Sequence, residues 1–227
     1  DDFKKGKLKK FYSNKECPDL SFSPPYNTKL LKRKKYFIYP VQTQRGCPNN
    51  CKFCSVPSVY GRKLRFRPIK TIEKEIEQIK SNFVLFSDDN FLKNIKRVEE
   101  ILSICKNSRK TFLIQTDLPS TSNFKLVKKS IKAGCRIFFI GFESIEKNNI
   151  LQIDKGFNLK YDYREIIKFI HNEGGCVVGS FIFGFDWDNE DTFKKTVDFC
   201  LKNKIDICLF TILTPLPGTI LFEAFKK

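Results

Sequence analysis

The sequence predicts an α/β fold, a partial barrel of six strand–helix units with parallel strands, formed by residues 36–227. Two observations predict it. Short apolar runs rich in Phe, Ile and Val alternate along the chain with stripes of apolar residues at helical spacing. Such alternation implies parallel strands joined by right-handed crossovers. The unusual polar and cysteine residues each follow an apolar run, which places them together at the rim where barrel enzymes build their sites.

Residues 1–35 precede the predicted barrel and differ from it in composition. They are rich in lysine, carry turn residues at 21–25 and show no sustained hydrophobic period. We interpret them as a linker or an irregular N-terminal extension. Two dense basic clusters, residues 4–10 and 32–35, lie in this segment and could pack against an acidic domain upstream.

The predicted strands are short apolar runs, and they cover residues 36–42, 83–87, 111–116, 136–141, 176–183 and 206–213. The predicted helices lie between these runs and each has one apolar stripe: Ile69, Ile72, Ile76 and Ile79; Ile95, Val98, Leu102 and Cys105; Phe124, Val127 and Ile131; Ile166, Phe169 and Ile170; Phe193, Val197 and Cys200. Gly134 and Gly174 stand where glycine commonly ends a helix.

Three cysteines follow the first predicted strand in CxxxCxxC order, at Cys47, Cys51 and Cys54. Three thiolates on one short loop can hold three corners of an iron–sulfur cluster and leave one iron open. A structural zinc site is the first alternative, but it requires a fourth ligand, and the only histidine, His171, is remote in sequence. A disulfide framework is the second, and nine cysteines in 227 residues do not suit a small stapled domain.

The stretch from Arg45 to Cys54, with Phe53 before the last cysteine, resembles the signature of the radical S-adenosylmethionine (radical SAM) superfamily. Further segments resemble its cobalamin-binding branch, and they are residues 55–57, 88–91, 141–144, 179–185 and 214–219. The resemblance implies a partial (βα)6 radical SAM barrel, a 4Fe-4S cluster on the three cysteines and S-adenosylmethionine on its open iron. It also implies a cobalamin domain upstream, which we expect this chain to lack.

The resemblance also implies a set of cofactor-binding residues. Phe53 is expected beside adenine, and Asp88 or Asp89 is expected to receive the amino group of S-adenosylmethionine. The remaining expected contacts are Glu143 for ribose hydroxyls or the amino group, Lys155 for the carboxylate, Ser180 for ribose and Thr214 for adenine. Two plainer interpretations stay open at this point: the aspartates could cap the following helix, and Lys155 could be a surface lysine.

The net charge is +17 at pH 7. It fits an anionic partner such as nucleic acid, or simply a lysine-rich solvated surface, and the spread of basic residues over the predicted helices favours the second. Six cysteines beyond the motif suit a reducing compartment, so we expect a cytoplasmic protein. No apolar run is long enough for a membrane span, and the start does not resemble a signal peptide.

The predicted function is therefore that of a radical SAM enzyme core that generates a 5′-deoxyadenosyl radical for cobalamin-dependent methylation or related C–H chemistry. The expected partners are a small-molecule substrate, such as a lipid or natural-product intermediate, and an electron donor such as flavodoxin or ferredoxin. An RNA-modifying radical SAM enzyme and a non-catalytic zinc-binding module are the alternatives.

Overall fold

The computed structural model of the protein describes residues 2–12, 16–27 and 36–226. The basic cluster at 32–35 lies outside the described residues. Within the part of the chain that is described, no helix combines the length and apolar character needed to cross a bilayer.

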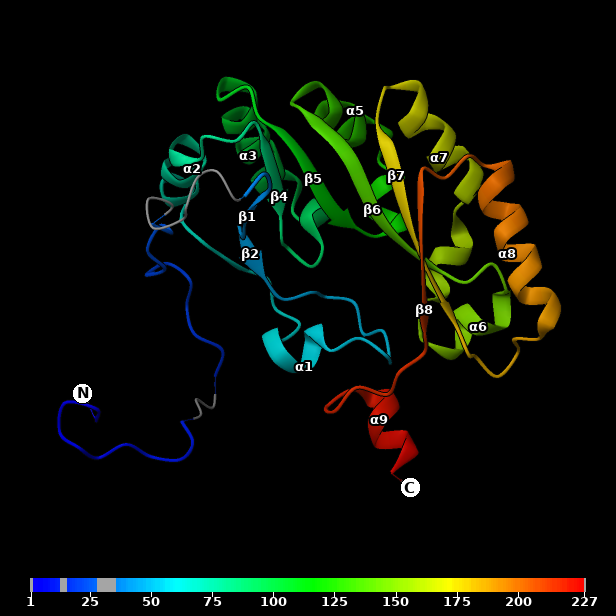
Figure 1. The fold of residues 1–227 in the computed structure, drawn as a ribbon, viewed down its shortest axis with the longest axis horizontal. Coiled ribbons are helices and arrows are strands. Elements are labelled where there is room, and N and C mark those ends of the chain that lie inside the picture. Colours follow the sequence, from blue (N-terminus) through cyan, green and yellow to red (C-terminus); the bar gives the residue numbers. More distant parts are fainter. Residues whose placement is uncertain (1, 13–15, 28–35, 227) are drawn as a thin grey trace.

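A curved sheet of six parallel strands forms the centre of the fold (Figure 1). The strands are β1 (Tyr39–Val41), β4 (Phe83–Phe86), β5 (Thr111–Thr116), β6 (Cys135–Glu143), β7 (Cys176–Phe183) and β8 (Ile207–Ile212). Their order in the sheet is their order in the chain, and β1 and β8 do not pair with each other. The predicted partial barrel of six parallel strands is confirmed, because the sheet curls without closing.

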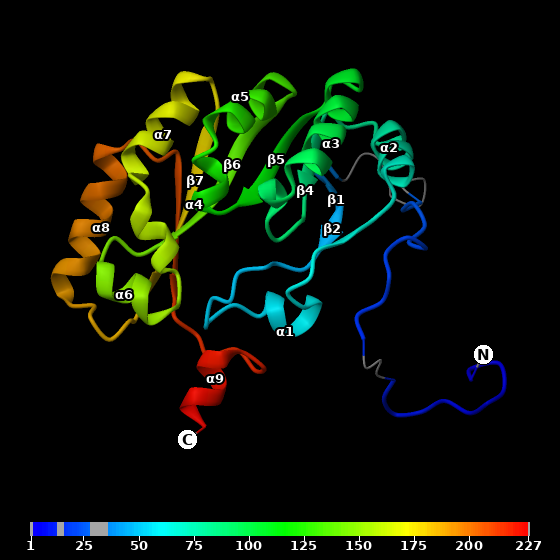
Figure 2. The same ribbon diagram turned by 180° about the vertical axis from the view of Figure 1, so that it is seen from behind.

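Helices cover one face of this sheet, as Figure 2 shows from behind. The five long helices lie where the five apolar stripes predicted helices: α2 (Ile69–Gln78), α3 (Ile95–Asn107), α5 (Phe124–Lys132), α7 (Tyr163–Asn172) and α8 (Glu190–Lys202). Shorter helices lie between the strands or, for the last of them, after β8: α1 (Val56–Tyr60), η2 (Phe91–Lys93), α4 (Leu118–Thr121), α6 (Lys147–Gln152), η3 (Gly156–Lys160) and α9 (Ile220–Phe225). Gly134 and Gly174 follow α5 and α7 with φ of 114° and 87°, as predicted for helix ends.

The core lies between the sheet and these helices. Alternate strand residues point outward into it, and the largest of them are fully buried: Phe86, Phe112, Ile114, Phe138, Phe142 and Phe181. The stripe predicted for α8 is only partly correct, because Phe193 and Val197 are exposed. The buried face of α8 instead carries Thr192, Thr196 and Cys200.

A capping box explains this rotation of α8. Asn189 accepts from the backbone N–H of Thr192, and the Thr192 hydroxyl accepts from the N–H of Asn189. The box fixes Thr192 against the sheet, and residues four and eight positions later share its face.

The N-terminal segment contains no helix or strand among its described residues, as predicted, but part of it is attached to the barrel. The guanidinium of Arg65 donates to the carbonyl of Pro18 at 2.7 Å, and that of Arg67 donates to the carbonyl of Pro24 at 3.0 Å. The backbone N–H of Tyr26 donates to Glu75 at 2.7 Å, and Leu20 is buried. Residues 18–27 therefore run along the barrel as a tethered strap.

Candidate functional site

The three motif cysteines lie on a loop, residues 46–54, that we call the cysteine loop. It follows β2 (Gln44–Arg45), which pairs antiparallel with β3 (Arg65–Phe66). Gly46 begins the loop with φ of 96°, and a Cβ there would collide with the carbonyl oxygen of Lys63. Glycine is therefore required by both the backbone angle and the close approach of the β2–β3 connection.

Contacts from several elements hold the cysteine loop across the rim formed by the carboxyl ends of the strands. The N–H of Cys47 donates to Gly61 at 3.3 Å, and the N–H of Lys52 donates to Ile153 at 3.1 Å. The carbonyl of Lys52 accepts from Leu221 in α9 at 2.9 Å. Helices α1, α6 and α9 thus meet around the loop, although they are far apart in sequence (Figure 1).

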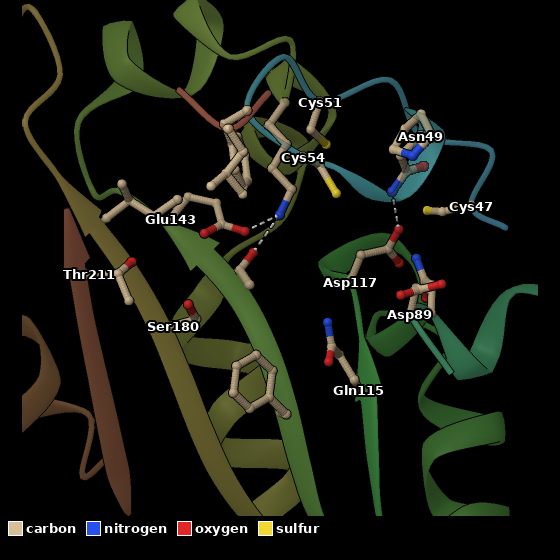
Figure 3. Close-up of a pocket in the computed structure, with 18 of the residues that line it drawn as sticks. Cys47, Asn49, Cys51, Cys54, Asp89, Gln115, Asp117, Glu143, Ser180 and Thr211 are labelled. Carbon is tan, nitrogen blue, oxygen red and sulfur yellow. Dashed lines mark hydrogen bonds and ion pairs between the residues drawn. The ribbon is translucent and has the colours of Figure 1, made fainter. Parts of the chain in front are cut away.

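All three thiols of the cysteine loop are free and line one cavity of about 370 Å³ (Figure 3). The cavity is also lined by Phe53, Asp89, Glu143, Lys155, Ser180 and Thr214, all of them predicted from the sequence. The barrel therefore brings together nine of the ten predicted site residues, and Asp88 is the one left outside the lining.

Burial dominates the acidity of the thiols. It raises the pKa of Cys51 to about 12, against a smaller opposing effect of the Lys155 charge. Burial also raises the pKa values of Cys47 and Cys54. For Cys47, a hydrogen bond from the Asn49 backbone reduces this effect. The thiols are therefore protonated in the metal-free protein, and any metal that binds them must displace protons.

No three His, Cys, Asp or Glu side chains among the described residues are arranged around a single metal ion. Ligands of a cubane cluster bind different irons, so they stand farther apart than the ligands of one zinc ion. Three free thiols that come from one loop and face one cavity fit a cluster held at three corners. The residues present therefore fit a 4Fe-4S group.

A buried ion pair between Lys155 and Glu143 forms part of the cavity wall. Lys155 Nζ lies 2.6 Å from Glu143 Oε1 and donates to the Gly141 carbonyl at 3.0 Å. Burial alone lowers the pKa of Lys155, but opposing effects led by the charge of Glu143 outweigh it, so the pKa of this lysine is raised. The interpretation of Lys155 as a surface lysine is wrong, since only 5% of it is exposed.

Local backbone geometry explains how the pair forms. Glu143 ends β6 in the left-handed region, with φ of 67°, and the register of β6 with β7 shifts between Gly141 and Glu143. This irregularity turns the carboxylate toward Lys155. A Cβ on Gly141 would collide with that carboxylate, so the glycine makes room for the pair.

The two aspartates after β4 have different surroundings. Asp88 is buried and accepts hydrogen bonds from the backbone N–H groups of Thr43 and Gln44, at 2.6 and 3.0 Å. Burial raises the pKa of Asp88 to about 6, although these hydrogen bonds oppose it. Asp89 lines the cavity, its Oδ2 is buried without a hydrogen-bond partner, and burial raises its pKa.

The interpretation of these aspartates as helix caps is wrong. The helix α3 is capped by Asn94, whose side chain accepts from the N–H of Arg97 at 3.0 Å. His171, the only histidine of the chain, contacts Asp206 at 2.9 Å.

Six polar residues of the lining are outside the predicted set: Asn49, Asn90, Gln115, Thr116, Asp117 and Thr211. Asp117 follows β5, and its carboxylate contacts Lys93 and Asn49. Burial favours a raised pKa for Asp117, but Lys93 and three hydrogen bonds outweigh it and lower that pKa to about 2. The available sequence signal was its position at the carboxyl end of a predicted strand, which it shares with the other site residues.

The protein is thus an open parallel α/β barrel that carries, at the carboxyl ends of its strands, a three-cysteine loop of the kind that binds iron–sulfur clusters. A model of the radical SAM superfamily matches residues 41–200. The chain belongs to the radical SAM superfamily, as the cysteine motif predicted.

Two relatives illustrate the sequence similarity. The chain is 31% identical to bacteriochlorophyllide d C-12(1)-methyltransferase of Chlorobaculum tepidum, over 99% of this chain and 52% of that protein. It is 25% identical to hopanoid C-2 methylase of Rhodopseudomonas palustris, over 95% of this chain and 43% of that protein. The chain spans about half the length of the curated relatives it matches.

Similarity to solved structures supports the fold. The radical S-adenosylmethionine methyltransferase TsrM from Kitasatospora setae, solved with cobalamin and a [4Fe-4S] cluster bound, aligns with a TM-score of 0.72 at 17% identity. The alignment covers 81% of this chain and 38% of TsrM.

Proposed function

We propose that this chain is the catalytic core of a radical SAM enzyme that takes part in methylation with cobalamin. The observation that carries the proposal is the convergence of three free thiols, an unpartnered aspartate and a buried ion pair on one cavity. When bound, a 4Fe-4S cluster and S-adenosylmethionine supply a 5′-deoxyadenosyl radical that removes a hydrogen atom from substrate.

In this proposal the three motif cysteines hold the cluster. Cys47, Cys51 and Cys54 bind as thiolates, and their raised pKa values mean that their protons leave as the cluster binds. The positive charge of Lys155 acts on Cys51 in the direction that favours its thiolate.

Other lining residues would hold S-adenosylmethionine. We assign its amino group to Asp89, because the Oδ2 of Asp89 lacks a partner, whereas Asp88 already accepts hydrogen bonds from Thr43 and Gln44. Lys155 would pair with the carboxylate of the cofactor, and Glu143 would keep Lys155 charged and oriented.

The remaining contacts concern the adenosine part. Phe53 would pack against adenine from the cysteine loop, and Thr214 would flank it from the segment after β8. Ser180 would meet the ribose from β7. Each of these side chains lines the same cavity, so one ligand can reach all of them.

The methylation part rests on the relatives, which are named as methyltransferases of bacteriochlorophyllide d and hopanoids. We propose a small organic substrate, a reducing partner such as flavodoxin or ferredoxin, and cobalamin bound by a domain outside this chain. The charged groups lining the cavity are Asp89, Asp117, Glu143 and Lys155. Because carboxylates outnumber the lysine, this lining does not favour a phosphate-rich substrate such as RNA, despite the net charge of +17.

Anaerobic reconstitution tests the proposal. The protein is loaded with iron and sulfide, reduced, and supplied with S-adenosylmethionine, and 5′-deoxyadenosine is measured with cluster absorbance. Replacing Cys47, Cys51 or Cys54 with Ala is expected to abolish both signals. Cys176→Ala, which alters an exposed thiol outside the cavity, is the matched control and is expected to retain both. Stoichiometric zinc in anaerobically purified protein, or deoxyadenosine from the motif variants, would refute the proposal.

A further inference from the structure

A hydrogen bond joins the middle of the cysteine loop to the end of β5. Asn49, between Cys47 and Cys51, donates from Nδ2 to Asp117 Oδ2 at 2.8 Å (Figure 3). The Asp117 side chain is about 5% exposed, so water does not readily replace this contact. A hydrogen bond to an ionised carboxylate is among the stronger kinds found in proteins.

The Asp117 carboxylate is itself held by two other elements. Lys93, from η2, places its Nζ 2.5 Å from Oδ2. The backbone N–H of Ser120 donates to Oδ1 at 3.0 Å, which makes Asp117 the N-cap of α4. Because both oxygens are fixed by the barrel, the carboxylate offers Asn49 a rigid acceptor.

Asn49 is also close to a motif thiol. Its backbone N–H is directed at the Cys47 thiol. The backbone–backbone contacts between the loop and other elements involve Cys47 and Lys52, and the guanidinium of Arg62 donates to the Pro48 carbonyl at 3.1 Å. The Asn49 side chain supplies a further, buried anchor between Cys47 and Lys52.

We propose that Asp117 is a positioning residue, which through Asn49 holds the segment carrying Cys47 and Cys51 in the geometry that receives the cluster. The cluster part of this inference rests on the proposed function. The claim that Asp117 and Asn49 hold the cysteine loop in place concerns only residues of this chain, and it applies to the metal-free protein.

Two variants break the contact in different ways. Asn49→Ala removes the donor and leaves Asp117 paired with Lys93. Asp117→Asn can still cap α4 with its carbonyl oxygen, but its amide then presents N–H groups to Asn49 and Lys93. Asp162→Asn is the matched control, because Asp162 caps α7 by accepting from Arg164 at 2.9 Å and does not line the cavity.

Hydrogen exchange of the metal-free protein gives the first test. The amides of residues 47–54 are expected to exchange roughly tenfold or more faster in Asn49→Ala and in Asp117→Asn, the change expected from losing a hydrogen bond to a charged group. Asp162→Asn should leave them unchanged, and the double variant of Asn49 and Asp117 should exchange no faster than either single variant. Wild-type exchange rates in both single variants would overturn the inference.

Loss of iron to a chelator from the reconstituted protein gives the second test. Asn49→Ala and Asp117→Asn are expected to speed the loss to a similar extent, because both release the loop. An effect confined to Asp117→Asn would show that the carboxylate acts by charge, and it would overturn positioning. If the wild-type protein assembles no cluster, the proposed function fails, and the exchange experiment still decides the role of Asp117.

Discussion

Lys155 and Glu143 form an ion pair, 2.6 Å between Nζ and Oε1, with side chains only 7% and 8% exposed. The two residues come from different elements, since Glu143 ends β6 and Lys155 precedes η3. Both face the cavity that the three thiols line. Two charges buried in this way cost solvation energy that is offset chiefly by their mutual contact, so either charge destabilises the fold when the other is removed.

Removing one member of this pair is expected to destabilise the fold strongly. Lys155→Met leaves Glu143 buried and uncompensated, and we expect a loss of about 3–5 kcal/mol in the free energy of unfolding, measured by urea denaturation. The double variant of Lys155→Met with Glu143→Met, which replaces the pair by apolar groups, should recover much of that loss. Additive losses from the two single substitutions would contradict this account.

Gly46 can be tested against a glycine of similar backbone angle. Gly174 has φ of +87° and open space around the position of a Cβ atom. Gly174→Ala is therefore expected to lower the free energy of unfolding by about 1–2 kcal/mol through the backbone angle alone. Gly46→Ala, with φ of +96°, adds a collision with the Lys63 carbonyl and should cost roughly another 1–3 kcal/mol. Equal unfolding free energies for the two variants would show that the close approach at Gly46 has no energetic weight.

The buried Asp88 is expected to make stability depend on pH. Its pKa is about 6 in the folded protein, raised by burial above an ordinary value of 3.8, so the native state binds this proton more tightly. The stability that protonated Asp88 contributes to the folded protein is therefore fully present below pH 3.8. It is lost as the pH rises to about 6, a change of roughly 3 kcal/mol in the free energy of unfolding.

Asp88→Asn tests this dependence, because the amide oxygen can still accept from the N–H groups of Thr43 and Gln44. Unfolding free energies of the wild type and the variant are measured from pH 4 to 7. The wild type should lose stability relative to Asp88→Asn across this range, and parallel curves would contradict the prediction.

Arg67 is expected to hold the tethered strap, residues 18–27. Its guanidinium donates to Glu75 at 3.0 Å and to the carbonyls of Gln42 and Pro24 at 2.7 and 3.0 Å. Arg67→Met should cost about 3–5 kcal/mol, because Glu75 stays buried without its charge partner. It should also speed proteolysis within the strap. Arg164→Ala breaks a solvent-exposed pair with Asp162 and is expected to change neither property.

Much of the fold could be predicted because its signals are local. The strand–helix alternation, the helix-ending glycines and the order of the units follow from periods and residue types read over short stretches. The cysteine motif likewise lies within one loop, so the family could be recognised from it. The face predicted for α8 is partly wrong, because it follows the apolar stripe that contains Phe193 and Val197, whereas the capping box at Asn189 and Thr192 orients the helix.

The sequence by itself determined the parallel barrel, the three-cysteine loop and the gathering of polar residues at one rim. The tertiary structure alone decided which of these residues have partners: Lys155 is buried against Glu143, Asp88 is held by Thr43 and Gln44, and Asp89 keeps an unpartnered oxygen. It also decided that Asp117 reaches Asn49, 68 positions earlier in the chain. The physical reason is that desolvation and charge pairing depend on distances in space, which sequence separation does not set.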